Sequence, residues 1–476
     1  MNLKKINDYQ YVIEKEGKMN VPVKLFCSEA LLEKIKQDKS LQQAMNVATL
    51  PGICGPVMVM PDAHQGYGFS IGGVTAFDVK EGIITPGGIG FDINCGVRLL
   101  TTPLTKEDIE PKVKELLDSL FNKVPPGVGS HTNMRLSDEE LEQVLENGSK
   151  WAIEKGFGFK EDLECTEESG TMKGADANTV SHRAKSRGRN QLGTLGSGNH
   201  FLEIQYVDKI FNPEIAKAFG IEKEGQVTII IHCGSRGLGH QVCSDYIRQM
   251  EEMYPYIAKN LPDRDLIHAP VGSKLAEKYF KAMCAAANFA WCNRQLIAHR
   301  VRESLKEVMD TDPKKVKQVY DVAHNIAKLE EHEFDGVMKQ VYLHRKGATR
   351  AFPPGHPDLP ERYQKTGQPI LIPGSMGTSS YVLVGTEKGM KESLGSTAHG
   401  AGRVMSRHEA LRRFQGEQIK AILHEKHIEI KAASYRGIAE EAPGVYKDID
   451  EVVKVSHEVG IGNLVVRVKP LGVIKG

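Results

Sequence analysis

Gln226-Val227-Thr228-Ile229-Ile230-Ile231-His232 is a β-branched run that ends in a histidine, and the glycine-rich loop Cys233-Gly234-Ser235-Arg236-Gly237-Leu238-Gly239 follows it. β-branched residues favour strands, so this run predicts a buried strand with His232 at its carboxyl end. Residues 316–323 repeat the arrangement, because a second predicted strand ends at His324-Asn325. Open α/β sheets build their sites at such strand ends, and we therefore interpret both histidines as metal ligands.

Helical patterns occupy much of the remaining chain. A capping box begins a helix predicted over residues 105–120, and another helix begins at Ser137. The longest apolar stripe covers about residues 273–309, and a further capped helix is predicted over residues 406–422. We assign these stripes to the core.

Composition limits the possible functions. The 476 residues predict about three domains from length alone. The 62 basic residues nearly balance the 61 acidic ones, so any polyanion must bind to local clusters and not to a global positive field. The eight cysteines include no C-x-x-C pair, which argues against a zinc knuckle and a secreted disulfide framework. Without a signal core or an apolar run of ~20 residues, the sequence predicts a soluble, cytoplasmic protein.

Two glycine-containing loops carry residue types that bind metals. Residues 61–68 follow an apolar run and contain an acid, a histidine and two glycines. Residues 82–98 contain Asp92 and Cys95, which are short enough to reach one cation from a single turn. Each loop also has an ordinary interpretation: an Asp/Gly turn for the first, and for Cys95 a small buried hydrophobic residue.

A basic stretch is followed directly by a glycine-rich one. Residues 183–189 contain four cations and no acid, which suits phosphate binding, although a solvated charge run has the same composition. Asn199, His200 and Glu203 then provide polar side chains at the start of an alternating strand pattern.

His399 is the residue that we expect to react. It lies in Ser396-Thr397-Ala398-His399-Gly400-Ala401-Gly402-Arg403, where small neighbours leave room for a bulky group beside the imidazole. The ordinary alternative is a loop histidine whose glycines only permit a turn. A second small-residue loop, 373–381, follows a predicted strand and suits a nucleotide through its hydroxyls and free amides.

Asp92, Cys95, His200, His232 and His324 are more ligands than one tetrahedral ion takes. If they converge, they indicate two ions that share the thiolate. Ligand softness alone favours zinc, but a mixture of imidazole, carboxylate and thiolate also admits manganese, so these residues leave the metal open.

Together the motifs resemble the RtcB family of RNA-splicing ligases, in order and across nearly the full chain. The segments that carry the resemblance are 62–68, 92–98, 193–203, 232–239, 324–325, 373–381 and 396–403. The resemblance implies a single α/β (α+β mixed) domain over residues 1–476, with sheets flanked by helices around a deep metal and nucleotide cleft. This expectation replaces the three domains suggested by length.

The resemblance also implies a reaction. Asp92, Cys95 and His200 would hold one Mn²⁺, and Cys95 with the other two histidines would hold a second. His399 would attack the α-phosphorus of GTP, release pyrophosphate and form a histidine-GMP phosphoramidate. The guanylate would pass to an RNA 3′-phosphate, and an RNA 5′-hydroxyl would then displace GMP. A 2′,3′-cyclic phosphate would first be opened by water.

Two further residue sets follow from the resemblance. The implied GTP pocket comprises Asn199, His200, Phe201, Leu202, Glu203, His324, Asn325, Pro373, Gly374, Ser375, Met376, Ser380, His399, Gly400, Ala401, Gly402 and Lys475, with Tyr446 stacking on guanine. The residues expected to hold RNA ends or to activate the hydroxyl are Asp62, Arg187, Arg236, Lys346 and Arg407. The implied partners are RNA with 3′-phosphate or 2′,3′-cyclic phosphate and 5′-hydroxyl ends, GTP and an archease-type activator. We expect a monomer that binds no membrane and acts in tRNA splicing or RNA repair.

Absent motifs agree with a histidine nucleophile. The chain has no G-x-x-x-x-G-K-[ST] loop, and the nearest match to the K-x-D-G signature, residues 333–336, has an acid in place of the lysine. The main alternative enzyme is a dinuclear metal-dependent phosphoesterase with water as nucleophile and His399 as general acid. A non-enzymatic protein that binds RNA ends is the second alternative.

Overall fold

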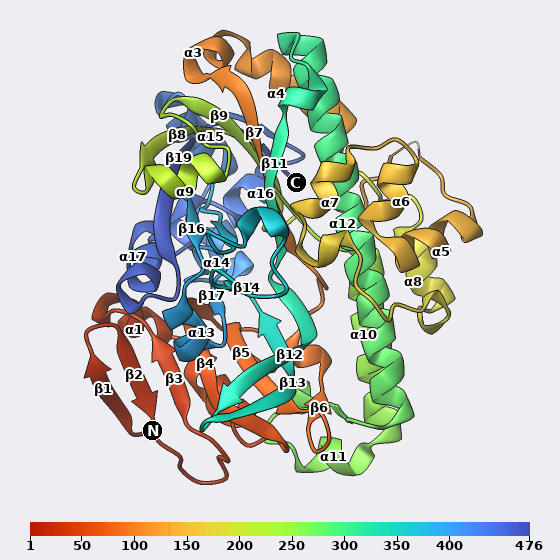
Figure 1. Cartoon of the computed structure of the whole chain (residues 1–476), viewed down its shortest axis with the longest axis vertical. Coiled ribbons are helices and arrows are strands. Elements are labelled where there is room, and N and C mark those ends of the chain that lie inside the picture. Colours follow the sequence, from red (N-terminus) through yellow and green to blue (C-terminus); the bar gives the residue numbers. More distant parts are fainter. Residues whose placement is uncertain (133) are drawn as a thin grey trace.

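The computed structural model describes residues 1–132 and 134–476, and two large sheets organise it (Figure 1). The 7-stranded sheet has the order β1 (Leu3–Asn7), β2 (Gln10–Ile13), β3 (Val23–Phe26), β4 (Ile53–His64), β5 (Ile71–Asp78), β13 (Val337–Lys346) and β12 (Asn325–Phe334). The 8-stranded sheet has the order β11 (Lys317–Ala323), β7 (Gly96–Thr105), β9 (Gln226–Cys233), β8 (Phe201–Ile210), β19 (Asn463–Lys475), β16 (Ser380–Val384) and β15 (Pro369–Ile372), with β18 (Glu429–Ala432) on β19.

Two small sheets complete the β-structure of the described residues. They are β6 (Ile83–Ile84) with β10 (Ala269–Pro270), and β14 (Ala348–Arg350) with β17 (Ser396–Ala398). Within the described chain, only the pairs β3 with β4 and β18 with β19 are parallel. The predicted strands before His232 and His324 are confirmed as β9 and β11, but they lie in a mainly antiparallel sheet.

Helices flank both large sheets. They are α1 (Glu29–Ile35), α2 (Ser40–Val47), α3 (Lys106–Ile109), α4 (Val113–Lys123), α5 (Asp138–Asn147), α6 (Ser149–Glu154), α7 (Lys160–Glu164), α8 (His182–Gly188), α9 (Pro213–Ala218), α10 (Arg236–Met253), α11 (Pro255–Asn260), α12 (Lys274–Met309), α13 (Glu387–Ser393), α14 (Arg407–Arg413), α15 (Gly416–Glu425), α16 (Tyr435–Glu440) and α17 (Ile449–Val459). The mixed α/β class implied by the resemblance, with sheets flanked by helices, is confirmed.

The longest helix, α12, is the green vertical element in Figure 1. The helix predicted over about residues 273–309 is confirmed, and Ser273 caps its N-terminus by accepting a hydrogen bond from the backbone N–H of Ala276. The part of α12 up to Leu296 packs into a core with α5, α6 and α10, and the part from Ile297 packs into a core with α4 and β9. The helix thus joins two cores, and Asn293, Arg294 and Gln295 are buried where the two meet.

Two predicted helices are wrong in extent. The helix expected over residues 105–120 is divided into α3 and α4 by a 3₁₀ turn at Glu110–Lys112, because Pro111 has no N–H to donate and its ring disfavours a continuous helix. The helix expected over residues 406–422 is divided into α14 and α15 at Phe414, whose backbone is extended and whose half-buried ring packs against the core. Partial burial of that ring stabilises the break.

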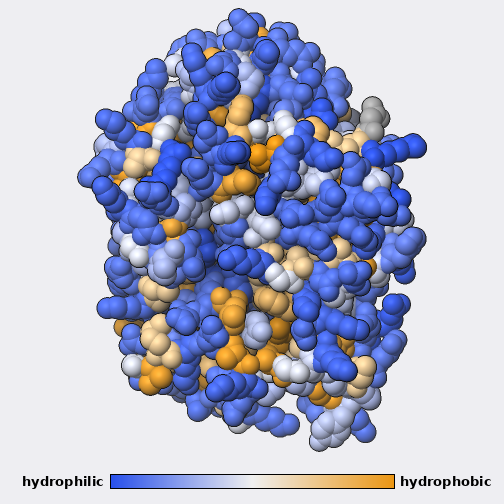
Figure 2. Space-filling view, turned by 45° about the vertical axis from the view of Figure 1, so that its right-hand side comes forward, coloured by the Kyte–Doolittle hydropathy of each residue, from blue (hydrophilic) through white to orange (hydrophobic). Residues whose placement is uncertain are grey.

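The surface is mainly hydrophilic on the face in Figure 2, and its hydrophobic side chains form small groups, of which the most extensive lie in the lower half. In the part of the chain that the structure describes, no helix has a sufficiently long apolar stretch to span a bilayer.

Candidate active site

Strand register brings the candidate metal ligands together. β7 lies between β9 and β11 and is antiparallel to both, so its first residue, Gly96, pairs with Cys233 of β9 and with Ala323 of β11. Cys95 and the two histidines at the ends of β9 and β11 are sequence neighbours of these paired residues. They therefore meet at one end of the sheet.

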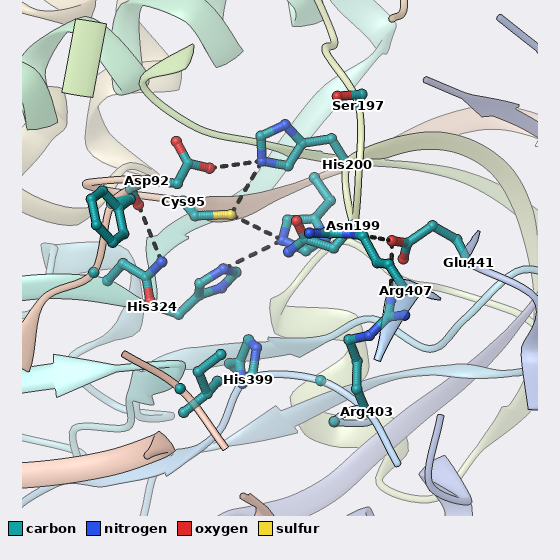
Figure 3. Close-up of a pocket in the computed structure, with 18 of the residues that line it drawn as sticks. Asp92, Cys95, Ser197, Asn199, His200, His324, His399, Arg403, Arg407 and Glu441 are labelled. Atoms are coloured by element: carbon teal, nitrogen blue, oxygen red, sulfur yellow. Dashed lines mark hydrogen bonds and ion pairs between the residues drawn. The ribbon is translucent and has the colours of Figure 1, made fainter. Parts of the chain in front are cut away.

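All five expected metal ligands converge there (Figure 3). The Sγ atom of Cys95 lies 3.3 Å from Nε2 of His232 and 3.4 Å from Nε2 of His200. Nε2 of His232 lies 3.3 Å from Nε2 of His324, and Nε2 of His200 lies 2.8 Å from Oδ2 of Asp92. Two groups result, Asp92-Cys95-His200 and Cys95-His232-His324, and the ligand atoms of each lie within 4.8 Å of one another.

The chemistry of this donor set suits divalent cations. Burial lowers the pKa values of His232 and His324 well below the ordinary value, so both rings are neutral. The Nδ1 atom of His200 lies 3.1 Å from the carbonyl oxygen of Leu195, to which it can donate, and this leaves Nε2 as the ligand atom. Neutral imidazole, carboxylate and thiolate are established ligand types for such ions, and one shared thiolate can belong to both groups.

The charge state of Asp92 and Cys95 depends on their neighbours. Burial opposes protonation of His200, but Cys233, Cys95 and Asp92 outweigh it and raise the pKa of this ring well above its ordinary value, so His200 is protonated before metal binds. Burial likewise opposes ionisation of Asp92, but the His200 cation and Arg236 outweigh it and hold the pKa of this carboxyl at about 2. Burial and the nearby Asp92 raise the pKa of the Cys95 thiol to about 11. Since a thiol binds metal as the thiolate, metal binding here must displace a proton.

His399 reaches the same place from a different part of the fold. β17 pairs with β14, Ala398 lying opposite Ala348, and His399 follows directly. Its ring centroid lies 4.7 Å from that of His324. In Figure 3 His399 approaches the metal-ligand group from one side of the cavity. The nucleophile candidate and the metal candidates thus share one site.

Asp62 orients the imidazole of His399. Oδ2 of the buried Asp62 lies 2.6 Å from Nδ1 of His399 and accepts hydrogen bonds from the backbone N–H groups of His399 and Gly400. Gly402 has a φ of +72°, and a Cβ there would collide with the Asp62 backbone. The donor on Nδ1 leaves Nε2 of His399 with a free lone pair.

One cavity of about 1130 Å³ contains these groups. The residues expected from the sequence that line it are Asp92, Cys95, Arg187, Asn199, His200, Phe201, His232, Arg236, His324, Asn325, Lys346, Pro373, Gly374, Ser375, Met376, His399, Gly400, Ala401, Gly402, Arg407, Tyr446 and Lys475. Its volume lies slightly above the range of roughly 300–1,000 Å³ that is typical of small-molecule sites.

Four expected residues lie behind the cavity wall. Asp62 supports His399, and Leu202 packs into the apolar core because side chains alternate along β8. Glu203 is buried, and its Oε1 accepts a hydrogen bond from Nε2 of Gln205. Oγ of Ser380 accepts a hydrogen bond from the backbone N–H of Gly374, so Ser380 shapes the loop 373–376.

Glu441 is a cavity residue that the sequence analysis missed. It is 1% exposed and accepts hydrogen bonds from Nη1 of Arg403 at 3.0 Å and from Nε of Arg407 at 3.3 Å. The hydroxyl of Tyr446 donates to it, and Nζ of Lys475 lies 4.0 Å away. Figure 3 shows Glu441 with Arg403 and Arg407 beside the metal-ligand group. No local motif marks Glu441, because its arginine partners lie 38 and 34 positions away in the chain.

Comparison with known proteins agrees with this geometry. The family model described as tRNA-splicing ligase RtcB matches residues 43–476. The chain belongs to the RtcB family. A relative named tRNA-splicing ligase RtcB from Thermococcus kodakarensis is 56% identical over 477 residues, which covers 100% of this chain and 99% of that protein. Relatives of the same name from Pyrobaculum aerophilum and Archaeoglobus fulgidus are each 54% identical, with the same coverage. The RtcB resemblance drawn from the motifs is thereby confirmed.

Proposed function

We propose that this RtcB-family protein is an RNA ligase that joins an RNA 3′-phosphate or 2′,3′-cyclic phosphate end to a 5′-hydroxyl end, with GTP as co-substrate. Family membership and the names of the relatives support ligation of RNA in tRNA splicing. The observation that carries the proposal is the position of His399 beside His324 and the metal-ligand group. Residues 1–476 would work as one ligase domain.

The metal part of the proposal follows from the donor set. Asp92, Cys95 and His200 would hold one Mn²⁺, and Cys95 with His232 and His324 would hold a second. Bound there, the ions would neutralise charge on the phosphoryl oxygens and on the pyrophosphate leaving group.

His399 would supply the nucleophile. With its Nδ1–H donated to Asp62, the Nε2 lone pair would form an N–P bond to the α-phosphorus of GTP. The bridging P–O bond would break, and pyrophosphate would leave with its electron pair. Asp62 would stabilise the positive charge that develops on the ring, as a buried carboxylate does for other catalytic histidines.

The enzyme-bound guanylate would then be transferred to RNA and afterwards released as GMP. An oxygen of the RNA 3′-phosphate would attack the phosphorus, the N–P bond would break, and His399 would be restored. The 5′-hydroxyl of the second RNA would form the phosphodiester bond and GMP would leave. A 2′,3′-cyclic phosphate end would first be opened by water.

The cavity walls support separate positions for nucleotide and RNA. The loop 373–376, Gly400 and Lys475 would hold GTP, and Tyr446 would stack on guanine. Arg187, Arg236, Lys346 and Arg407, which also line the cavity, would hold RNA phosphates. Since the net charge of the chain is only +1, the electrostatic attraction for RNA must come from such a local cluster of cations.

Labelled GTP tests the proposal. With α-labelled GTP and Mn²⁺, we expect acid-labile label on the wild-type protein and none on His399→Ala. A dinuclear phosphoesterase would hydrolyse phosphate esters without retaining label, and that result would refute ligation. The proposal extends to a cytoplasmic monomer stimulated by an archease-type activator, which turnover measured with and without such a protein would test.

A further inference from the structure

We propose that Arg294 of α12 is a positioning residue for the Cys95-His232-His324 group. Its guanidinium forms hydrogen bonds to the three chain segments that carry these ligands. The inference rests on the metal site of the proposed function, and it adds a residue that touches neither a metal ligand atom nor a substrate.

Arg294 contacts two ligand segments through their backbones. It lies inside the fold with a fully buried side chain. Its Nη1 donates to the carbonyl oxygens of Asn94 and Cys233, each at 2.8 Å, and its Nη2 donates to Oδ1 of Asn94 at 2.9 Å. Asn94 precedes Cys95 and Cys233 follows His232. One planar group therefore ties the thiolate segment to the end of β9.

The third segment is held through a carboxylate. Asp321 of β11 lies three residues before His324, and its side chain is fully buried. Nε of Arg294 lies 2.9 Å from Oδ2 of Asp321, and Nη2 lies 2.8 Å from Oδ1. This bidentate contact fixes both the distance and the plane of the pair. All three ligand segments are thus hydrogen-bonded to the same guanidinium group on α12.

The backbone at Asn94 shows why this support matters. Asn94 has a φ of +52°, a left-handed conformation that places its carbonyl oxygen toward Arg294. Gly96 lies so near that a Cβ there would be 3.0 Å from Cζ of Arg294. The turn that presents Cys95 is therefore packed directly on this guanidinium.

Asn293, the preceding residue, supports the remaining ligand segment. It accepts a hydrogen bond from the backbone N–H of Gly193 at 2.7 Å and donates to the carbonyl oxygens of Thr194 and Gly234. The bonds to Gly193 and Thr194 hold the loop that leads to His200, and the bond to Gly234 holds the loop that follows His232. Two consecutive polar residues of a buried helix thus form hydrogen bonds to the loops of one site. Packing of the helix alone does not require this arrangement.

Lysine cannot replace this arrangement. Its ammonium is one nitrogen with three donors, whereas Arg294 reaches Asn94, Cys233 and Asp321 from three nitrogens. Arg294→Lys keeps the positive charge and loses the simultaneous hydrogen bonds to the three segments. Removal of outer partners of metal ligands typically weakens metal affinity ~10–100-fold.

Co²⁺ binding to the full-length protein, without GTP or RNA, tests the proposal. The thiolate-to-cobalt absorption band reports Cys95 ligation independently of ligase activity. For Arg294→Lys we expect Co²⁺ affinity to fall ~10–100-fold relative to wild type. The matched control is Arg302→Lys on the same helix, since Arg302 forms an equally buried bidentate pair with Asp162, both contacts at 2.7 Å, and touches no ligand segment. Its Co²⁺ affinity should equal that of wild type.

Equal Co²⁺ affinities of Arg294→Lys and Arg302→Lys would overturn the proposal. If Arg294→Lys does not fold, Co²⁺ affinity is measured on Asn94→Gly instead. Glycine adopts a φ of +52° freely, and the change removes one hydrogen-bond acceptor of Arg294. A weaker Co²⁺ affinity of Asn94→Gly supports the positioning role, and an unchanged one refutes it. Absence of the cobalt band in the wild-type protein would instead refute the metal site of the proposed function.

Discussion

Oδ2 of Asp62 lies 2.6 Å from Nδ1 of His399, although 337 positions separate the two residues in the chain. Burial opposes ionisation of Asp62, but His399 and Lys447 outweigh it and keep the pKa of the carboxyl below its ordinary value. An ionised Asp62 accepts the Nδ1–H of His399 and holds its loop through the backbone N–H bonds. The pair therefore sets both the tautomer and the direction of the imidazole.

For Asp62→Asn we expect the rate of protein guanylylation to fall on the order of 10²–10⁴-fold, because an amide does not stabilise the imidazolium or enforce the tautomer. The measurement is the initial rate of acid-labile label from α-labelled GTP. Asp208→Asn, which removes an ion-paired carboxylate on β8 away from the cavity, is the control and should label normally. Normal labelling by Asp62→Asn would contradict the orienting role.

Cys95→Ser should weaken Mn²⁺ binding at both groups, since both include this sulfur. We expect at least a ~10-fold loss of affinity and loss of guanylylation, with little change in the thermal stability of the metal-free protein. Bound manganese after dialysis measures the effect. Cys54→Ser, at a half-buried position on β4, should retain the wild-type metal content. Equal manganese content in the two variants would argue against Cys95 as the shared ligand.

Burial raises the pKa of Glu203 to about 8. An unfolded glutamate has a pKa of about 4.3, so between these values the folded state keeps a proton that the unfolded state releases. The free energy of unfolding should therefore fall as the pH rises from about 5 to about 8. Glu203→Gln removes this dependence, and we expect it to be more stable than wild type by ~1–3 kcal/mol at about pH 8.5 and equal to it near pH 4. Urea unfolding of the metal-free protein at several pH values measures this.

Glu441→Gln is the matched contrast to Glu203→Gln. Burial opposes ionisation of the Glu441 carboxyl, but Lys475, Arg403 and Arg407 outweigh this effect and lower the pKa of Glu441. A lowered pKa means that the carboxylate contributes stability above its unfolded pKa, which is lost as the pH falls. Glu441→Gln should therefore be less stable than wild type at neutral pH. A gain in stability in both variants would show that Glu441 is not stabilised by these cations.

Arg187→Ala should weaken RNA binding, and the variant should still be guanylylated by GTP. Arg187 lines the cavity, and its Nη1 donates to Oε1 of Gln241, which presents the guanidinium at the rim. We expect the salt slope of RNA binding to fall by about 1, as for loss of one phosphate contact. Arg264→Ala, in an exposed pair with Glu251, is the control for overall charge. An identical salt slope in the two variants would remove Arg187 from the RNA-binding set.

The family, the side chains that we expect to bind metal and the local elements that carry them could all be predicted from the amino-acid sequence. The strands before His232 and His324 and the cap at Ser273 follow from β-branched runs and short-range hydrogen bonding, which depend on neighbouring residues. The roles of GTP, manganese and the RNA-binding residues stay predictions. Helix extent was predictable only where no proline or buried ring interrupted the pattern.

Tertiary structure alone decided which residues meet. The pairing of Gly96 with both Cys233 and Ala323 is a matter of strand register, which long-range packing selects. The contact of Asp62 with His399 likewise joins distant segments. Local patterns specify whether a residue is helical or extended. The partner of a buried charge depends on the whole fold, because a buried charge needs a hydrogen-bonded or oppositely charged partner wherever in the protein it lies.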